Sequence, residues 1–372
     1  MTLSGPGQHP MYKRLYTKPD GRTLGLYGRT PIVVAAAIPS PLPRRNESSS
    51  HFRWHPLLGE WVVYADHRQE RTFLPPAEYN PLAPTTDEQH PTELPAGTYD
   101  VAVFENLFPT MTANAQTPPP SMTETRPGVG ACEVIVFTQD LHSSLGSLSL
   151  SHLEVVLEVW ADRYRELGSR DEIQYVFPFE NRGVEVGVTL SHPHGQIYAY
   201  PFVPPLPALE LRHQTDYYRT HGRGLLEDHI AAEIKDGRRM LYAGEEAVAF
   251  VPSYARYAYE VWIAPRRPSP SLASLTPPER HDFARALKTV LLKYDGLWGT
   301  PFPYVMVFHQ APTDGQLHPE SHLHIECYSA YRMPGRLKYL AGSELGAGVF
   351  TSDTLPEVKA SELQRVPVHV DD

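Results

Sequence analysis

The chain contains the same order of sequence elements twice, and this internal repeat restricts the folds open to it more than any other feature. In the first copy an apolar strand at residues 134–137 is followed by a helix, a further strand and a His-x-His pair that begins at His192. In the second copy residues 261–264 start the same series, which ends in a pair that begins at His322. The two spans are similar, 58 and 61 positions from first strand to first histidine. A duplicated unit of strands and one helix predicts an α+β protein of two similar halves.

Each copy also carries a helix start signal. A capping box at residues 151–154 predicts a helix to about Gly168, and a box at residues 276–279, with proline at the first helical position, predicts a second helix to about Tyr294. Further strands are expected in the alternating or apolar runs 61–64, 101–104, 175–179, 184–190, 197–202, 248–251 and 304–308.

Changes in composition predict the boundaries between the parts of the chain. Residues 1–50 are rich in Pro, Gly, Ser and basic residues, and we interpret them as a poorly packed, partly ordered N-terminal arm with one strand at 32–37. The remaining predicted parts are the first half at 51–206, a helical linker at 207–240, the second half at 241–350 and a C-terminal tail at 351–372.

The segment from His192 to Gln196, His-Pro-His-Gly-Gln, is the strongest candidate for a reactive site. Pro193 stiffens the backbone between the two histidines, and Gly195 allows a close approach to a ligand. Gln196 adds an amide donor beside His194, and a rigidly held neutral imidazole next to a donor suits nucleophilic attack on phosphorus. The alternative interpretation is a pair of structural histidines near a tight turn.

Two arginines follow the strand at residues 61–64. Arg68 and Arg71 are three positions apart at the exit of this strand, a spacing that suits phosphate binding. A solvated basic loop explains the same spacing equally well, so the residues alone leave both interpretations open.

Charge and cysteine content exclude several classes of protein. The formal charge of -10 comes from 33 Lys and Arg against 43 Asp and Glu, which argues against extended nucleic-acid binding but permits a small phosphorylated ligand. Cys132 and Cys327 are the only cysteines, so no disulfide framework is expected. No stretch reaches the ~18 apolar residues of a transmembrane helix. The run 32–38 is short and ends at Pro39, unlike a signal peptide, so we expect a soluble cytoplasmic protein.

These motifs together resemble the galactose-1-phosphate uridylyltransferases of the histidine-triad superfamily. The resemblance rests on the segment from His192 to Gln196, on Phe179-Glu180-Asn181 before it and on the second His-x-His pair after it, and it covers roughly residues 51–350. It implies two antiparallel half-barrels flanked by helices. It also implies a reaction that exchanges UMP between UDP-glucose and galactose 1-phosphate in two steps.

The resemblance assigns a role to each candidate residue. His194 would attack the α-phosphorus of UDP-glucose to form a uridylyl-histidine, and Gln196 would donate to a phosphoryl oxygen. For Lys338, a sugar-phosphate contact competes with the interpretation as a solvated surface lysine. The implied substrate-binding residues are Arg68, Arg71, Asn106, Phe108, Asn181, Thr189, Gln196 and Lys338.

One metal site is also implied by the resemblance. One carboxylate and three imidazoles suit zinc or ferrous iron, and we expect one structural divalent ion that ties the linker to the second half. The alternative is a set of polar groups without metal. The implied ligands are Glu210, His309, His322 and His324.

A second metal site found in many family members is expected to be absent. Its two histidines correspond to His142 and His192, but its two cysteine positions correspond to Asn80 and Ala83. Alanine cannot ligate a metal, so hydrogen bonds are expected to replace this site. A homodimer is implied by the resemblance alone.

The sequence leaves three other functions open. A related ADP-sugar or dinucleotide phosphorylase would use the same nucleophile with another acceptor. A non-catalytic nucleotide-binding module would keep only the fold. A metal-dependent hydrolase would need an open coordination position, which the implied four-ligand set does not provide. The sequence leaves open the preferred hexose 1-phosphate and the choice between zinc and iron.

Overall fold

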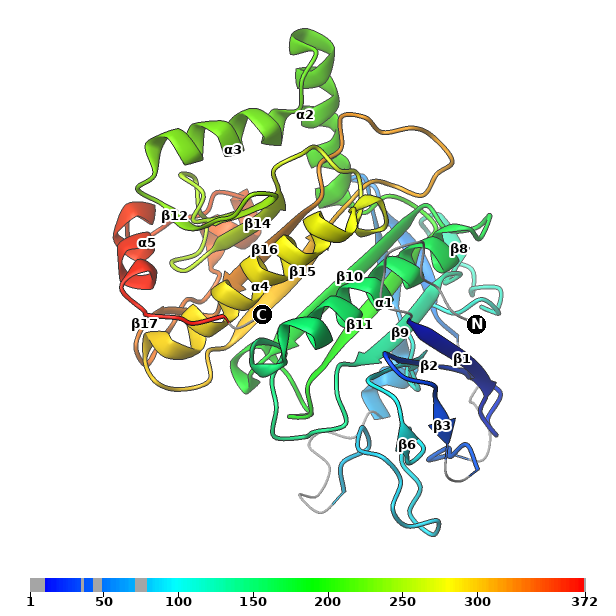
Figure 1. The fold of residues 1–372 in the computed structure, drawn as a ribbon. Coiled ribbons are helices and arrows are strands. Elements are labelled where there is room, and N and C mark those ends of the chain that lie inside the picture. The colour runs from blue at the N-terminus through cyan, green and yellow to red at the C-terminus, as the bar shows by residue number, and fades with distance from the viewer. Residues whose placement is uncertain (1–10, 35–36, 43–48, 71–78, 371–372) are drawn as a thin grey trace.

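Eleven strands form one continuous antiparallel sheet in the computed structural model, which describes residues 11–34, 37–42, 49–70 and 79–370 (Figure 1). The order across the sheet is β1 (Tyr12–Thr17), β2 (Thr23–Gly28), β7 (Val101–Glu105), β9 (Ala131–Val136), β11 (His194–Tyr200), β10 (Tyr175–Arg182), β15 (Tyr304–His309), β16 (His324–Ser329), β14 (Val261–Pro265), β13 (Ala247–Phe250) and β12 (Met240–Ala243).

The remaining elements surround this sheet. The helices are α1 (Leu150–Gly168), α2 (Pro205–His221), α3 (Leu225–Asp236), α4 (Pro277–Leu297) and α5 (Pro356–Gln364). Smaller sheets consist of β4 (His51–His55), β5 (Glu60–Tyr64) and β8 (Thr125–Pro127), of β3 (Val33–Val34) and β6 (Gly97–Thr98), and of β17 (Tyr331–Met333) and β18 (Arg336–Leu337). Single turns lie at Asp66–Glu70, Leu145–Ser147, Val184–Val186, Leu272–Ser274 and Ser343–Ala347.

The internal repeat is visible in the order of the elements. The first copy runs β7, β9, α1, β10, β11 and the second runs β13, β14, α4, β15, β16. The halves join where β10 pairs with β15, with Phe179 opposite Val307 and Arg182 opposite Tyr304. The prediction of an α+β protein of two fused antiparallel halves is therefore confirmed.

One hydrophobic core spans both halves. Helices α1 and α4 lie side by side over one face of the sheet (Figure 1). Trp160 of α1 packs against Phe308 of β15, with ring centroids 4.7 Å apart, so each half buries side chains of the other. The domain boundaries stay predictions, because the sheet and the core continue from one half into the next.

Both helix predictions hold, with one shift at a start. Thr276 caps α4 in a reciprocal pair with Glu279, as predicted. Helix α1 instead begins at Leu150, because the hydroxyl of Ser149, not Ser151, accepts from the amide of His152. A cap needs an extended residue before the first turn, and Ser149 occupies that position.

Two other sequence interpretations are wrong. The predicted strand at 184–190 is a single turn at Val184–Val186, because Gly183 and Gly187 both take a positive φ that reverses the chain. The strand predicted at 32–37 is limited to Val33–Val34 among the described residues, and residues 35–36 lie outside them.

The interpretation of residues 1–50 as a poorly packed arm is wrong for the described part that forms β1 and β2. Strand β2 pairs with β7 in the main sheet, and Leu24 and Leu26 are fully buried there. Lys18 and Arg22 are also buried, because both pair with the carboxylate of Glu93 at 2.7 and 2.8 Å. Because basic residues can be buried when they are paired with a carboxylate, the basic composition of this segment does not indicate poor packing.

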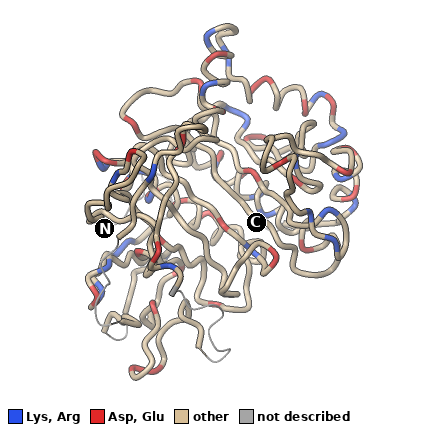
Figure 2. Tube along the Cα trace, turned by 180° about the vertical axis from the view of Figure 1, so that it is seen from behind, with Lys and Arg blue, Asp and Glu red and all other residues tan. Residues whose placement is uncertain are grey.

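Charged residues of both signs are interspersed around the periphery on the side of the sheet away from α1 and α4 (Figure 2). Among the residues that the structure describes, none of the helices combines the length and the apolar composition needed to cross a membrane.

If β1 and β2 belong to the main core, truncating Leu26 should destabilise the whole protein. Leu26 is buried opposite Ala102, and Leu26→Ala should lower the free energy of unfolding by about 2–5 kcal/mol. The matched control Leu15→Ala, on the neighbouring strand at 60% exposure, should change it by less than about 0.5 kcal/mol. Equal effects of the two substitutions in denaturant unfolding would contradict this placement.

Candidate active site and metal centre

His194 begins β11, the strand held between β9 and β10 near the middle of the sheet. Side chains alternate along this strand, so Gly195 and Ile197 are buried under the helices while His194 and Gln196 are half-buried on the opposite face. The pairing of His194 with Val136 places the candidate nucleophile at the end of a fully paired strand.

A backbone hydrogen bond sets the tautomer of His194. Its Nδ1 lies 2.7 Å from the carbonyl oxygen of His192, and a carbonyl can only accept, so Nδ1 carries the proton. The ring lone pair is therefore on Nε2. This is the protonation state that a nucleophilic imidazole requires.

Gly195 is needed for packing. A Cβ at this position would lie 2.9 Å from the ring of Phe137 and 2.9 Å from the carbonyl oxygen of Phe179. The backbone of β11 therefore lies too close to its neighbours for any side chain. The sequence interpretation gave this glycine a role in ligand approach, and the structure adds a steric requirement from the opposite face.

A cavity of about 180 Å³ opens beside the histidine, and we call it the His194 cavity. It is a polar cavity formed by β10, β11, the segment before β11 and the turn at Asp66–Glu70. Five of the predicted site residues line it: Arg68, Asn181, Thr189, His194 and Gln196.

Two further predicted residues are connected to this cavity through Arg68. Arg68 Nη1 donates to the carbonyl oxygen of Phe108 at 3.0 Å, and Asn106 Oδ1 accepts from the amide of Phe108 at 2.9 Å. The structure therefore brings Arg68, Asn106 and Phe108 together. Arg71 lies outside the described residues.

Lys338 does not lie in the His194 cavity of its own chain. It follows β18 and lines a separate cavity of about 380 Å³ with Arg332 and Arg336. Its Nζ donates to the carbonyl oxygen of Thr351 at 2.6 Å and lies 3.4 Å from Glu344. Within one chain, the predicted sugar-phosphate contact is not formed.

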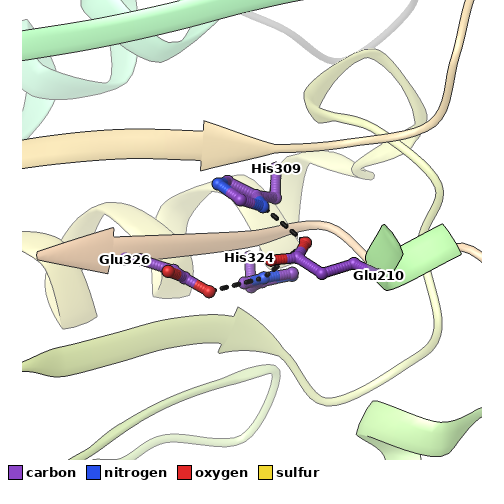
Figure 3. Close-up of side chains that lie close together, drawn as sticks. All are labelled: Glu210, His309, His324 and Glu326. Atoms are coloured by element: carbon purple, nitrogen blue, oxygen red, sulfur yellow. Dashed lines mark hydrogen bonds and ion pairs between the residues drawn. The ribbon is translucent and has the colours of Figure 1, made fainter. Parts of the chain in front are cut away.

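A second cluster of ionisable side chains lies in the other half (Figure 3). Glu210 extends from α2 toward His309 at the end of β15 and toward His324 and Glu326 on β16. One ligand atom from each of these four residues lies within 4.8 Å of the others. His309 Nδ1 is 2.5 Å from Glu210, and His324 Nε2 is 3.3 Å from Glu326.

The cluster contains three of the four predicted metal ligands. His322 is not one of these four residues but borders them. Its Nε2 bonds the carbonyl oxygen of Pro265 at 2.8 Å, and it lines a small cavity together with Glu210, His309 and His324. Glu326 was missed by the sequence interpretation. It lies two positions after His324 on one strand, so alternation along β16 puts both side chains on the same face and was the available signal.

The donor set fits a divalent cation. His322 Nδ1, His324 Nε2 and Glu326 Oε1 are buried without a hydrogen-bond partner, although the last two are close enough for an ion pair. Burial opposes a charge on His324, but the carboxylates of Glu326 and Glu210 outweigh it and raise its pKa. Several buried nitrogen and carboxylate donors without hydrogen bonds are the arrangement that a bound zinc or iron ion would satisfy.

The family's second metal site does not fit this chain. His192 is buried, and its two ring nitrogens are 3.0 Å from Asn80 Nδ2 and 2.7 Å from the carbonyl oxygen of Thr138. His142 is exposed, and Ala83 has no ligand atom. Both ring nitrogens of His192 are engaged in hydrogen bonds, so neither is available as a metal ligand.

The fold and the His194 cavity define the class: a protein of two fused, similar α+β halves that share one antiparallel sheet, with a candidate nucleophilic histidine at a polar cavity. Models of the N-terminal and C-terminal domains of galactose-1-phosphate uridyl transferase match residues 42–204 and 210–372. The chain belongs to the galactose-1-phosphate uridyl transferase family. The resemblance inferred from the motifs is confirmed.

Individual relatives agree with this family. The galactose-1-phosphate uridylyltransferase of Thermotoga maritima is 35% identical over 86% of this chain and 99% of its own, and that of Streptomyces lividans is 38% identical over 80% of each. A solved uridylyltransferase structure matches 85% of this chain and 98% of its own at 34% identity with a TM-score of 0.76. An ADP-glucose phosphorylase from Arabidopsis thaliana shares the fold, at 22% identity, a TM-score of 0.64, and coverage of 86% of this chain and 100% of its own.

We expect the purified protein to carry about one divalent metal ion per chain, measured by inductively coupled plasma mass spectrometry. Replacing both Glu210 and His324 by alanine should remove this ion, because they are central to the cluster. The control His142→Ala should leave the metal content unchanged. Two ions per chain would contradict the assignment of Asn80 and His192 to hydrogen bonds, and none would remove the metal centre.

Glu180, next to Asn181, should make stability depend on pH. Burial raises its pKa from 4.5 to about 7, partly offset by the hydroxyl of Tyr304, 2.9 Å away, and by Arg182, while Asp295 adds to the increase. A raised carboxyl pKa favours the folded state at low pH, so this stability is present below about pH 4.5 and is lost as the pH rises through about 7.

We therefore expect the free energies of unfolding of Glu180→Gln and of the unaltered protein to diverge as the pH rises. At pH 5 their free energies of unfolding should be similar, and at pH 8 the variant should be more stable by on the order of 3 kcal/mol. Parallel stability curves over this range would contradict the assignment of a protonated Glu180 in the folded state.

Proposed function

We propose that this protein is a UDP-glucose–hexose-1-phosphate uridylyltransferase that carries UMP on His194 between UDP-glucose and galactose 1-phosphate. The observation that carries the proposal is the tautomer of His194, with its Nδ1 proton bonded to a carbonyl at the wall of a polar cavity. The names of the relatives support the substrates, and five cavity residues that match the family motifs support the site.

In the first step, the Nε2 lone pair would attack the α-phosphorus of UDP-glucose. The bond from this phosphorus to the bridging oxygen breaks, and glucose 1-phosphate leaves with the electron pair. The Nδ1 proton stays on the ring of His194, and the His192 carbonyl that accepts its hydrogen bond stabilises the positive charge that develops there. No proton has to move, so no general base is needed for the attack.

In the second step, a phosphate oxygen of galactose 1-phosphate would attack the same phosphorus. The phosphorus–nitrogen bond breaks, its electron pair returns to Nε2, and UDP-galactose leaves. In both steps negative charge concentrates on the non-bridging oxygens of the uridylyl group. Gln196, Asn181 and Arg68 line the cavity and could donate to these oxygens.

The metal would have a structural part in this proposal. Zinc or ferrous iron held by Glu210, His309, His324 and either Glu326 or His322 would join α2 to β15 and β16. Such an ion supplies positive charge to a buried acidic cluster and fixes the helix that follows the first half.

We further propose a cytoplasmic homodimer. Lys338 lies outside the His194 cavity of its own chain, which a hexose-phosphate site completed by a second copy would explain. Cys132 and Cys327 are buried and unpaired, which supports a reducing compartment.

Substitution of the nucleophile tests the proposed reaction. His194→Ala and His194→Gln should lose transfer of UMP to radiolabelled galactose 1-phosphate by about 10⁴-fold or more, since both remove the imidazole on which the proposed covalent intermediate forms. Their thermal unfolding should stay close to that of the unaltered protein, because the side chain is half-buried at a cavity wall. Near-normal transfer by either variant would contradict the assignment of His194 as the nucleophile.

A further inference from the structure

We propose that Asn80 is a positioning residue for His194, and that its side-chain amide does in this chain what a metal ion would do at the family's second site. Asn80 Nδ2 lies 3.0 Å from Nδ1 of His192, whose backbone carbonyl holds the nucleophile. The inference deepens the proposed function and rests on it for the role of His194.

The orientation of the Asn80 amide is determined by a second contact. The backbone amide of Leu82 donates to Asn80 Oδ1 at 3.0 Å, and a backbone N–H can only donate. The oxygen of the amide is therefore on the side of Leu82, and the NH₂ group faces the histidine. Nδ1 of His192 must then accept.

The other nitrogen of His192 is assigned by the same reasoning. Nε2 lies 2.7 Å from the carbonyl oxygen of Thr138, so it carries the proton and donates. The ring is thus neutral and is held from two sides, by Asn80 from an earlier segment and by the backbone that follows β9. Its burial, which lowers the pKa of His192, supports the neutral form.

We call the two hydrogen bonds to the His192 ring, from Asn80 and to Thr138, the His192 clamp. It acts on the nucleophile through the backbone. The carbonyl of His192 accepts the Nδ1 proton of His194 at 2.7 Å, with only Pro193 between them. Pro193 has a fixed φ, and its own carbonyl accepts from the amide of Phe137 at 3.2 Å. Because this short segment is rigid, a change in the position of the His192 ring would shift the carbonyl that orients His194.

Asn80 does not line the 180 Å³ His194 cavity, although it lines an adjoining cavity of about 620 Å³ together with His194. Because its amide nitrogen and oxygen already bond His192 and Leu82, its loss should affect the chemical step more than the binding of UDP. We expect Asn80→Ala to slow the single-turnover release of glucose 1-phosphate from saturating UDP-glucose by about 10–100-fold. The dissociation constant for UDP should stay within about twofold. A side chain that merely stabilises the fold would not produce this separation.

Asn80→Asp keeps the shape of the side chain and the contact to Leu82 but presents an oxygen to Nδ1 of His192. The hydrogen bond to Nδ1 of His192 can then form only with one additional proton, either on that ring nitrogen or on the introduced carboxyl group. The ratio of the variant rate to the unaltered rate should therefore be near one at low pH and should fall toward the Asn80→Ala value as the pH rises. Asp140 is the other charged group that acts on this ring.

Two controls separate this role from general destabilisation. Tyr79 precedes Asn80, and its hydroxyl donates to the carbonyl oxygen of Pro91 at 3.1 Å. Tyr79→Phe removes this hydrogen bond and should leave the single-turnover rate unchanged. Metal content should be the same in Asn80→Ala as in the unaltered protein. If Asn80→Ala does not fold, the pH dependence of Asn80→Asp tests the proposal by itself.

The outcomes are distinguishable. If the unaltered protein releases no glucose 1-phosphate, the proposed function fails and this inference fails with it. If it does release glucose 1-phosphate but both Asn80 variants react as fast at every pH, only the positioning role is overturned. A loss of UDP affinity equal to the loss of rate, or loss of one metal ion per chain in Asn80→Ala, would also overturn it.

Discussion

The antiparallel pairing of β10 with β15 joins the two halves of the chain into one sheet, and the rest of the molecule depends on it. It brings α1 and α4 together on one face, where Trp160 of the first half packs against Phe308 of the second. It also separates the two functional clusters, because β10 borders the His194 cavity while β15 ends at the metal cluster. A single core thus supports two chemically different sites.

The two copies share their backbone hydrogen bonds and differ in what faces the imidazoles. His194 and His324 both donate from Nδ1 to the carbonyl two residues earlier, at 2.7 and 2.9 Å. His192 donates from Nε2 to a carbonyl just beyond the end of β9 at 2.7 Å, and His322 donates from Nε2 to the carbonyl at the end of β14 at 2.8 Å. In the first copy the remaining nitrogens are Nε2 of His194, the candidate nucleophile, and Nδ1 of His192, which lies against Asn80. In the second copy Nε2 of His324 lies 3.3 Å from the carboxylate of Glu326 and Nδ1 of His322 is buried without a hydrogen-bond partner, so the same arrangement provides candidate metal ligands.

Features carried by local patterns could be predicted from the sequence, and features that depend on distant contacts could not. The repeat, the helix cap at Thr276 and the cavity residues Asn181 and Gln196 follow from spacing and motif. The burial of Lys18 and Arg22 in the turn before β2 depends on pairing with Glu93, which lies far away in the sequence. Glu326 was visible in the strand pattern, but only the placement of Glu210 on α2 shows what it faces.

The proposed covalent bond between UMP and His194 is tested most directly by the intact mass of the protein after mixing with UDP-glucose. We expect a gain of one uridylyl group, absent in His194→Ala and reversed when galactose 1-phosphate is added. A gain that only inorganic phosphate or an adenine nucleotide reverses would indicate a phosphorylase on the same fold. No gain with UDP-glucose would contradict the central claim.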